Sequence, residues 1–326
     1  MFKALILKQE DNKTIASIEH LDESSLPEAD TLVEVSHSSL NYKDGLAVTG
    51  QGKIIRSFPM VPGIDFVGRV IESRSSELKA GQNVVLTGWG VGETHWGGMA
   101  EKACVKADWL VPLPDTMSPS DAMMVGTAGL TAMLCVQALV DGGITPGDGH
   151  VLVTGASGGV GSIAVTLLSE LGFSVSAMTG RAKENQTLLT TLGASEIIER
   201  ATFEEPAKPL EKQCWAGVID TVGSKVLAKA LAQTKYNGVI AACGLAGGFD
   251  LPTTVMPFIL RNVRLQGIDS VMCPATKRIA AWQRISELLP EKYFKDACTT
   301  ISLEDVPEFA NKIIQGKVTG RVIVKI

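Results

Sequence analysis

The pattern of hydrophobic and polar positions along the chain changes near residue 150. Before that point, short apolar runs alternate with polar residues and are separated by glycines and prolines, a pattern typical of strands joined by turns. The runs that we predict as strands are 3–8, 31–37, 67–73, 83–86 and 100–105. We therefore expect a β-rich, barrel-like domain in the first part of the chain.

From Val151 onward, strand-like runs alternate with helical patterns. The predicted strands are 151–154, 174–178, 196–198, 216–220, 238–243 and 264–268. This alternation predicts an α/β fold, a doubly wound parallel sheet of six strands with helices on both faces. After it we predict a helix to residue 289, a strand at 297–301, a helix at 306–315, and a last strand at 321–326 that rejoins the first domain. The expected domains are 1–125 with 294–326, and 126–293.

A glycine-dense turn follows the first of these strands, where residues 151–161 read Val-Leu-Val-Thr-Gly-Ala-Ser-Gly-Gly-Val-Gly. Gly155 permits a tight turn, and Gly161 allows the helix to pack on the strand. The turn and the positive end of the helix at 160–171 together form a site for pyrophosphate. We predict that a dinucleotide contacts Ser157, Gly158, Gly159 and Val160. A glycine turn with no ligand is the alternative, because the spacing is G-x-x-G-G-x-G and not G-x-G-x-x-G.

The end of the second strand indicates which dinucleotide is bound. An NAD site places Asp or Glu there, whereas residues 178–183 read Met-Thr-Gly-Arg-Ala-Lys and no carboxylate precedes Glu184. A hydroxyl and a planar guanidinium suit a 2′-phosphate, so we expect NADPH and assign Thr179, Gly180 and Arg181 to it. The alternative is a solvated basic start of a helix.

Composition narrows the functional classes. The 326 residues, 45% apolar and 20% charged, are enough for two cores, and the net charge of −5 argues against a nucleic-acid or anionic-membrane partner. Six cysteines without a C-x-x-C pair indicate neither a disulfide framework nor a thiol redox motif, which suits the cytoplasm. The N-terminal apolar run is too short for a signal peptide. Residues 122–140 carry no charge, and we interpret them as a buried helix, not a membrane span.

Several motifs carry a resemblance that covers the whole chain. They lie at 39–44 (Ser-Leu-Asn-Tyr-Lys-Asp), 62–65 (Pro-Gly-Ile-Asp), 88–98, 126–132, 220–223 (Asp-Thr-Val-Gly) and 253–262, together with the glycine turn. The chain resembles the medium-chain dehydrogenases/reductases, in their zinc-free quinone-oxidoreductase-like branch, and within it the bacterial NADPH-dependent acrylyl-CoA reductases. The resemblance implies a GroES-like catalytic domain beside a Rossmann domain. It also implies reduction of the C=C bond of a small α,β-unsaturated acyl-CoA by a homodimer that pairs through the sixth strand.

Metal chemistry is not expected. Zinc-dependent relatives carry a cysteine in the segment that here reads Asn41 to Asp44, and Gly-His-Glu where this chain has Gly63-Ile-Asp65. The closely spaced cysteines of a structural zinc lobe are missing, and the four histidines are isolated from any cysteine. Without a Lewis acid, an activated C=C bond or a quinone is easier to reduce than a simple ketone.

The resemblance also assigns further residues to the site. It places Tyr42 beside the nicotinamide, where the phenol stacks, contacts the cofactor or passes a proton to the substrate, and an ordinary core tyrosine is the alternative. We assign Asp44 to catalysis and Thr127 to the cofactor, and helix capping explains either one equally well. The remaining residues that the resemblance assigns to the cofactor are Arg200, Leu245, Ile259 and Ser270, which otherwise read as surface, core or turn positions.

Two other functions stay open at this point. A quinone reductase of the same fold would have a flat apolar slot for its substrate and no site for the phosphates of CoA. A protein that holds NADPH without turning it over, as a sensor or a structural protein, would share the cofactor site alone.

Overall fold

The chain passes back and forth between two units. The computed structural model describes all 326 residues. Unit 1 comprises residues 1–127, 270–286 and 298–326, and unit 2 comprises residues 128–269 and 287–297. The boundaries expected from the sequence place 270–286 with the nucleotide-binding part, whereas in the structure this segment groups with unit 1.

Unit 1 is built on a mostly antiparallel sheet of seven strands in the order β14-β15-β3-β4-β5-β7, with β6 paired to β3. The last strand, β15, lies between β14 and β3, so the C-terminus does rejoin the first part of the chain. Buried valines, leucines and Phe66 form one of its cores. The strands are β3 (Thr31–Ser39), β4 (Asp65–Ser73), β5 (Asn83–Thr87), β6 (Lys102–Val105), β7 (Leu110–Pro112), β14 (Cys298–Ser302) and β15 (Arg321–Lys325).

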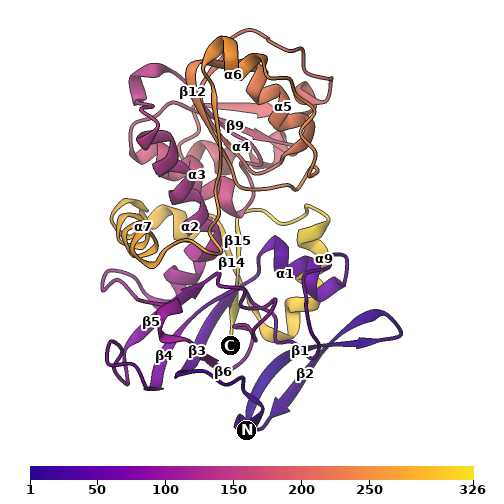
Figure 1. Cartoon of the computed structure of the whole chain (residues 1–326), viewed down its shortest axis with the longest axis vertical. Coiled ribbons are helices and arrows are strands. Elements are labelled where there is room, and N and C mark those ends of the chain that lie inside the picture. Colours follow the sequence, from indigo (N-terminus) through magenta and orange to yellow (C-terminus); the bar gives the residue numbers. More distant parts are fainter. The chain divides into compact units, whose positions relative to one another are not determined.

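A hairpin of β1 (Phe2–Glu10) and β2 (Lys13–Leu21) forms a separate two-stranded sheet in unit 1 (Figure 1). Its turn residues Asp11 and Asn12 both have positive φ, at 48° and 62°, as a tight two-residue hairpin turn requires. The helices of unit 1 include α1 (Tyr42–Thr49) and α9 (Val306–Ile314), which pack together (Figure 1). A Cβ on Gly45 would lie 2.6 Å from Ile313, which shows how closely these helices approach.

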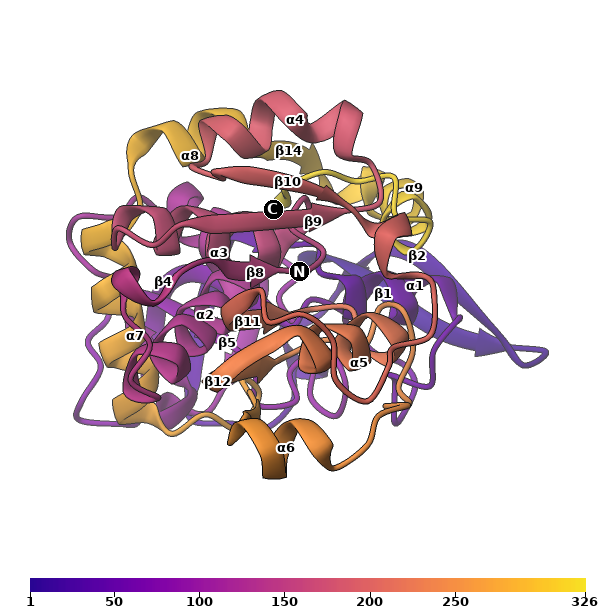
Figure 2. The same cartoon turned by 90° about the horizontal axis from the view of Figure 1, so that it is seen from above.

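Unit 2 is a parallel sheet in the order β10-β9-β8-β11-β12-β13 (Figure 2). This is the Rossmann strand order, in which the direction of winding reverses between the first and fourth strands. The strands are β8 (Val151–Val153), β9 (Val175–Thr179), β10 (Glu196–Glu199), β11 (Trp215–Asp220), β12 (Thr234–Ala242) and β13 (Arg264–Gly267). The helices are α3 (Gly159–Glu170), α4 (Ala182–Thr191), α5 (Ser224–Gln233), α6 (Met256–Arg261) and α8 (Glu291–Asp296).

Two further helices belong to both units. They are α7 (Ala275–Leu288) and α2 (Pro119–Asp141), which is interrupted at Gly126 by a non-helical backbone with φ 51° and ψ −155°. Helix α2 is long and apolar enough to cross a membrane, but 78% of its most apolar window is buried inside the protein. Burial of that extent is typical of a core helix, as we expect from the sequence.

Candidate active site

The glycine turn lies at the carboxyl end of β8 and leads into α3. Gly155 has φ 60°, and a Cβ on Gly161 would lie 2.3 Å from the Gly155 carbonyl oxygen, so both positions need glycine for the turn to close. The N-cap residue Gly158 brings no capping side chain, and the first turn of α3 has no acidic residue. The N–H groups at the start of α3 therefore remain available to an anion.

Several residues that the sequence assigns to the cofactor meet at the carboxyl end of β9. The Thr179 hydroxyl lies 2.8 Å from the Ser157 hydroxyl, and the Arg181 N–H donates to Thr179 Oγ1 at 3.3 Å. A Cβ on Gly180 would lie 3.1 Å from Cζ of Arg200, so the guanidinium of Arg200 lies directly over this glycine. The structure thus brings hydroxyl and guanidinium groups together, which is a donor set that suits a phosphate dianion.

Asp220 joins the ends of β8 and β11, where the winding of the sheet reverses. Its carboxylate accepts a hydrogen bond from the Thr154 hydroxyl at 2.7 Å and from the Gly223 N–H at 2.8 Å. Thr221 adds a bond from its hydroxyl to the Thr154 carbonyl oxygen at 2.9 Å. Burial raises the pKa of Asp220 above its ordinary value. These bonds fix the crevice in which open α/β sheets bind their ligands.

Two residues assigned to the cofactor by resemblance lie elsewhere on unit 2. Leu245 follows β12, and Ile259 lies on α6. The two residues are 61% and 72% exposed. Their role at the cofactor stays a prediction.

Unit 1 holds a buried polar cluster around the carboxylate of Asp65. Its Oδ1 accepts from the N–H and the hydroxyl of Ser39, at 3.2 and 2.6 Å. Its Oδ2 accepts from Asn41 Nδ2 at 3.1 Å and from the N–H of Thr127 at 2.7 Å. Because Asn41 precedes α1 and Thr127 begins the second part of α2, one carboxylate holds the starts of two helices.

Arg321, the first residue of β15, completes this cluster and was not predicted from the sequence. Its guanidinium donates to Asn41 Oδ1 at 3.1 Å, to Ser39 Oγ at 2.8 Å and to the Met124 carbonyl oxygen at 3.0 Å. A Cβ on Gly126 would lie 2.7 Å from Arg321 Nη2 and 2.8 Å from Asp65 Oδ2. The sequence did offer one indication of this role, because Arg321 is a cation at the start of an otherwise apolar predicted strand.

Asp44 lies in the first turn of α1 and is fully buried. Its Oδ2 accepts from the N–H of Asn41 at 2.9 Å, and its Oδ1 accepts from the N–H groups of Gly63 and Ile64 at 3.1 and 3.0 Å. Burial and the nearby Asp65 carboxylate raise the pKa of Asp44 to about 7. The carboxyl group therefore ties α1 to the segment before β4, and it titrates near neutral pH.

Tyr42 is the first residue of α1, and its side chain is 40% exposed. The cluster around Asp65 and the backbone contacts of Asp44 fix the turn from which this phenol projects. Ser270 is buried within unit 1, at the point where the chain returns from β13. The structure therefore connects Asp44 and Thr127 through one hydrogen-bonded cluster, with Tyr42 next to Asn41 in the chain, and it places Ser270 on a different segment of the same unit.

The residues of this cluster do not fit a metal ion. No group of three or more His, Cys, Asp or Glu side chains lies together anywhere in the chain. At Asp65, both carboxylate oxygens already accept hydrogen bonds, and the guanidinium of Arg321 lies next to them. A bound cation would face this guanidinium and would have no thiolate or imidazole ligand.

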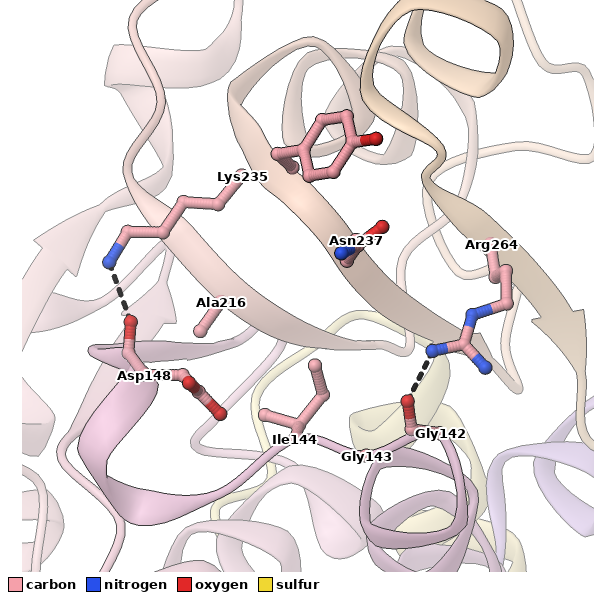
Figure 3. Close-up of a pocket in the computed structure, with 9 residues that line it drawn as sticks. Gly142, Gly143, Ile144, Asp148, Ala216, Lys235, Asn237 and Arg264 are labelled. Atoms are coloured by element: carbon pink, nitrogen blue, oxygen red, sulfur yellow. Dashed lines mark hydrogen bonds between the residues drawn. The ribbon is translucent and has the colours of Figure 1, made fainter.

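A hollow of about 420 Å³ opens at the amino ends of the parallel strands, where β11, β12 and β13 begin (Figure 3). Its two cations already donate to backbone carbonyl groups, Lys235 to Asp148 at 2.7 Å and Arg264 to Gly142. Ligands of Rossmann sheets bind at the carboxyl ends of the strands. We therefore do not assign the cofactor to this hollow.

Comparison with known protein families identifies two domains in the chain. Residues 27–115 match the alcohol dehydrogenase GroES-like domain family, and residues 159–289 match the zinc-binding dehydrogenase family. The second family is named for a metal that the donor set described above does not fit. The matches confirm the predicted pairing of a GroES-like domain with a Rossmann domain.

Individual relatives match over almost the full length of the chain. The chain is 60% identical to "Probable acrylyl-CoA reductase AcuI" of Escherichia coli, with 99% of both chains covered. It is 50% identical to "Acrylyl-CoA reductase AcuI" of Ruegeria pomeroyi, with 100% of this chain and 99% of the relative covered.

A crystal structure of the yhdH oxidoreductase from Salmonella enterica in complex with NADP superimposes with a TM-score of 0.98. It has 61% sequence identity, and 99% of both chains is covered. The chain therefore belongs to the medium-chain dehydrogenases/reductases, in the quinone-oxidoreductase-like family that includes the acrylyl-CoA reductases.

Proposed function

We propose that this chain is an NADPH-dependent reductase that converts a small α,β-unsaturated acyl-CoA, acrylyl-CoA, to propionyl-CoA without zinc. The observation that carries the proposal is the combination of a phosphate-binding donor set at β9 with a buried cluster that has no metal ligands. The relatives named as acrylyl-CoA reductases support the choice of substrate.

NADPH supplies a hydride when it is bound. In our proposal Ser157, Gly158, Gly159 and Val160 contact its pyrophosphate. The N–H groups of Gly159 and Val160 donate to it, because the start of α3 has no capping side chain. Thr179, Gly180, Arg181 and Arg200 hold its 2′-phosphate, since their donors converge at the end of β9. Leu245, Ile259, Ser270 and Thr127 contact its nicotinamide end.

The reaction adds two hydrogens to the substrate. The hydride joins the β-carbon, the π electrons of the C=C bond move toward the thioester oxygen, and a proton from solvent reaches the α-carbon. Each turnover therefore consumes one NADPH and one proton and releases one NADP⁺. The negative charge that develops on the thioester oxygen requires hydrogen-bond donors, and backbone N–H groups suit this purpose.

Tyr42 contacts the cofactor and substrate in this proposal, and Asp44 acts by holding the start of α1 that carries Tyr42. The variant Tyr42→Phe tests whether the phenol also passes the proton. A fall in kcat of about 100-fold, with a changed solvent deuterium isotope effect, is expected for a proton carrier. Retention of both quantities would assign Tyr42 to contact alone.

The proposal includes a homodimer in the cytoplasm. β13 ends the parallel sheet, its outer edge has no strand partner, and its residues are mostly exposed. The six cysteines are all free thiols, which suits a reducing compartment. Light scattering after size exclusion should give twice the chain mass of 34.5 kDa, and a mass near 34.5 kDa would exclude the dimer.

Product analysis tests the proposed reaction. NADPH deuterated at the transferred position should yield propionyl-CoA with one deuterium at the β-carbon, detected by mass spectrometry. Consumption of NADPH with a simple quinone, and none with acrylyl-CoA, would instead show a quinone reductase. Binding of NADPH without turnover of either substrate would show a protein that only holds the cofactor.

A further inference from the structure

Arg278, on α7, joins two segments of unit 1 that are far apart in the sequence. Its Nη1 donates to the carbonyl oxygen of Thr87 at 2.5 Å and to the Thr87 hydroxyl at 2.7 Å. Its Nη2 donates to the carbonyl oxygens of Ser270, Val271 and Cys273, each at 3.2 Å. The residue is 1% exposed. A single guanidinium thus connects the end of β5 to the segment in which the chain returns to unit 1.

The same two segments also touch directly beside this guanidinium. Gly88 has φ 81°, and a Cβ there would lie 2.7 Å from the carbonyl oxygen of Val271, so only glycine permits the approach. The N–H of Trp89 donates to that carbonyl oxygen at 3.0 Å. Cζ of Arg278 lies 4.9 Å from the centre of the Trp89 ring, which is within cation–π range.

Burial of a guanidinium in this place needs a reason, because moving a charged group out of water is unfavourable and an apolar side chain would fill the volume without that penalty. Arginine differs from other residues in that its donors are fixed in a planar fork and can reach acceptors on two sides at once. Here the guanidinium donates hydrogen bonds to four carbonyl groups and one hydroxyl, which come from two segments. The arrangement fixes the segment 270–273 more closely than apolar packing would.

The hydrogen bonds continue from this point to the start of α1. The N–H of Gly88 donates to the carbonyl oxygen of Ile64 at 3.1 Å, and the N–H of Ile64 donates to Asp44 Oδ1 at 3.0 Å. A displacement of the 270–273 segment would therefore move Ser270 and, through these hydrogen bonds, also shift the turn that carries Tyr42.

We propose that Arg278 is a positioning residue for the nicotinamide end of the site, acting by holding Ser270 and the Gly88 turn in fixed register through its guanidinium fork. The inference rests on the proposed function, because that function assigns Ser270 and Tyr42 to the cofactor. It adds a specific requirement, namely that the fork and not the positive charge alone supports hydride transfer.

The test uses the full-length variant Arg278→Lys, which keeps the charge and loses the fork. Measured with NADPH and acrylyl-CoA, its kcat should fall about 10- to 100-fold, since misplacement of reacting groups by about 1 Å has effects of this size. The deuterium isotope effect with deuterated NADPH should rise as hydride transfer becomes limiting. The Kd for NADPH should stay within about threefold, because unit 2 holds the phosphates in our proposal.

Two further variants keep the test decisive. Thr87→Val removes one acceptor of Nη1 and little volume, and it should lower kcat by about 3- to 10-fold with the same rise in isotope effect. Lys277→Met removes an exposed cation from the neighbouring position of α7 and should match the wild type. If Arg278→Lys does not fold, the same comparison is made with Thr87→Val.

The outcomes separate the inference from the proposed function. A lowered melting temperature with unchanged kcat per folded molecule and an unchanged isotope effect would reduce Arg278 to a structural residue and overturn the inference alone. A wild-type protein that does not oxidise NADPH with acrylyl-CoA would overturn the proposed function, and the inference with it.

Discussion

Replacement of Asp65 by asparagine tests whether its carboxylate holds the starts of α1 and the second part of α2. The substitution keeps the shape of the side chain and replaces one acceptor oxygen by an NH₂ donor. Both oxygens of the native side chain accept two hydrogen bonds each, from Ser39, Asn41 and Thr127. Whichever oxygen the NH₂ group replaces, the two groups that donated to that oxygen then face another donor.

The expected cost follows from these contacts. A hydrogen bond to a buried charged group contributes about 1.5–3 kcal/mol. Loss of the carboxylate also removes the negative charge that the Ser39 hydroxyl links to the buried guanidinium of Arg321. Because the side chains around the amide can rotate and recover part of the loss, we expect destabilisation of about 3–5 kcal/mol.

Urea unfolding followed by circular dichroism measures this loss directly. Asp22→Asn is the matched control, because Asp22 is an exposed N-cap that accepts from the Ser24 N–H at 3.0 Å, and asparagine caps equally well. The control should stay within about 0.5 kcal/mol of the wild type. If Asp65→Asn also unfolded within about 1 kcal/mol of the wild type, the four hydrogen bonds would not stabilise the cluster as argued.

Three other predictions concern cofactor, pH and metal. Arg200→Ala should raise the KM for NADPH about 10- to 100-fold and leave that for NADH unchanged, as steady-state kinetics with both cofactors will show. Because folding raises the pKa of Asp44 from 3.8 to about 7, the folded state favours its protonated form, so unfolding free energy should fall by about 4 kcal/mol between pH 4 and 8. Melting curves of Asp44→Asn should lack this decrease, and an unchanged pH dependence would contradict the assignment. Excess chelator should leave kcat unaltered, whereas inactivation that zinc reverses would refute the metal-free site.

Local patterns predicted the parts of the fold that depend on neighbouring residues. Each β-branched run of unit 2, and the glycine turn between β8 and α3, is a pattern formed by residues close together in the sequence. The sheet contains all six predicted strands. The strand β2 was missed because residues 13–21 are nearly all partly exposed and lack a clear apolar face. The adjacent Asp11-Asn12 turn was a usable signal for that hairpin.

The contacts that build the candidate site are mostly out of reach of sequence patterns. Arg321 meets Asn41 across 280 positions, and Arg278 meets Thr87 across 191. No local periodicity predicts which buried cation meets which acceptor at such separations. That the residues after β8 and β9 lie close together was predictable, because parallel strands bring their carboxyl ends to one edge of the sheet. Their contact with phosphate stays a prediction.

The initial rate of NADPH oxidation with acrylyl-CoA shows whether this protein is a zinc-free acyl-CoA reductase, with NADH in a parallel assay and a chelator in both. We expect fast turnover with NADPH, much slower turnover with NADH, and no effect of the chelator. Brisk oxidation of NADPH by a quinone, with none by acrylyl-CoA, would contradict the proposed function while leaving the fold and the cofactor site intact.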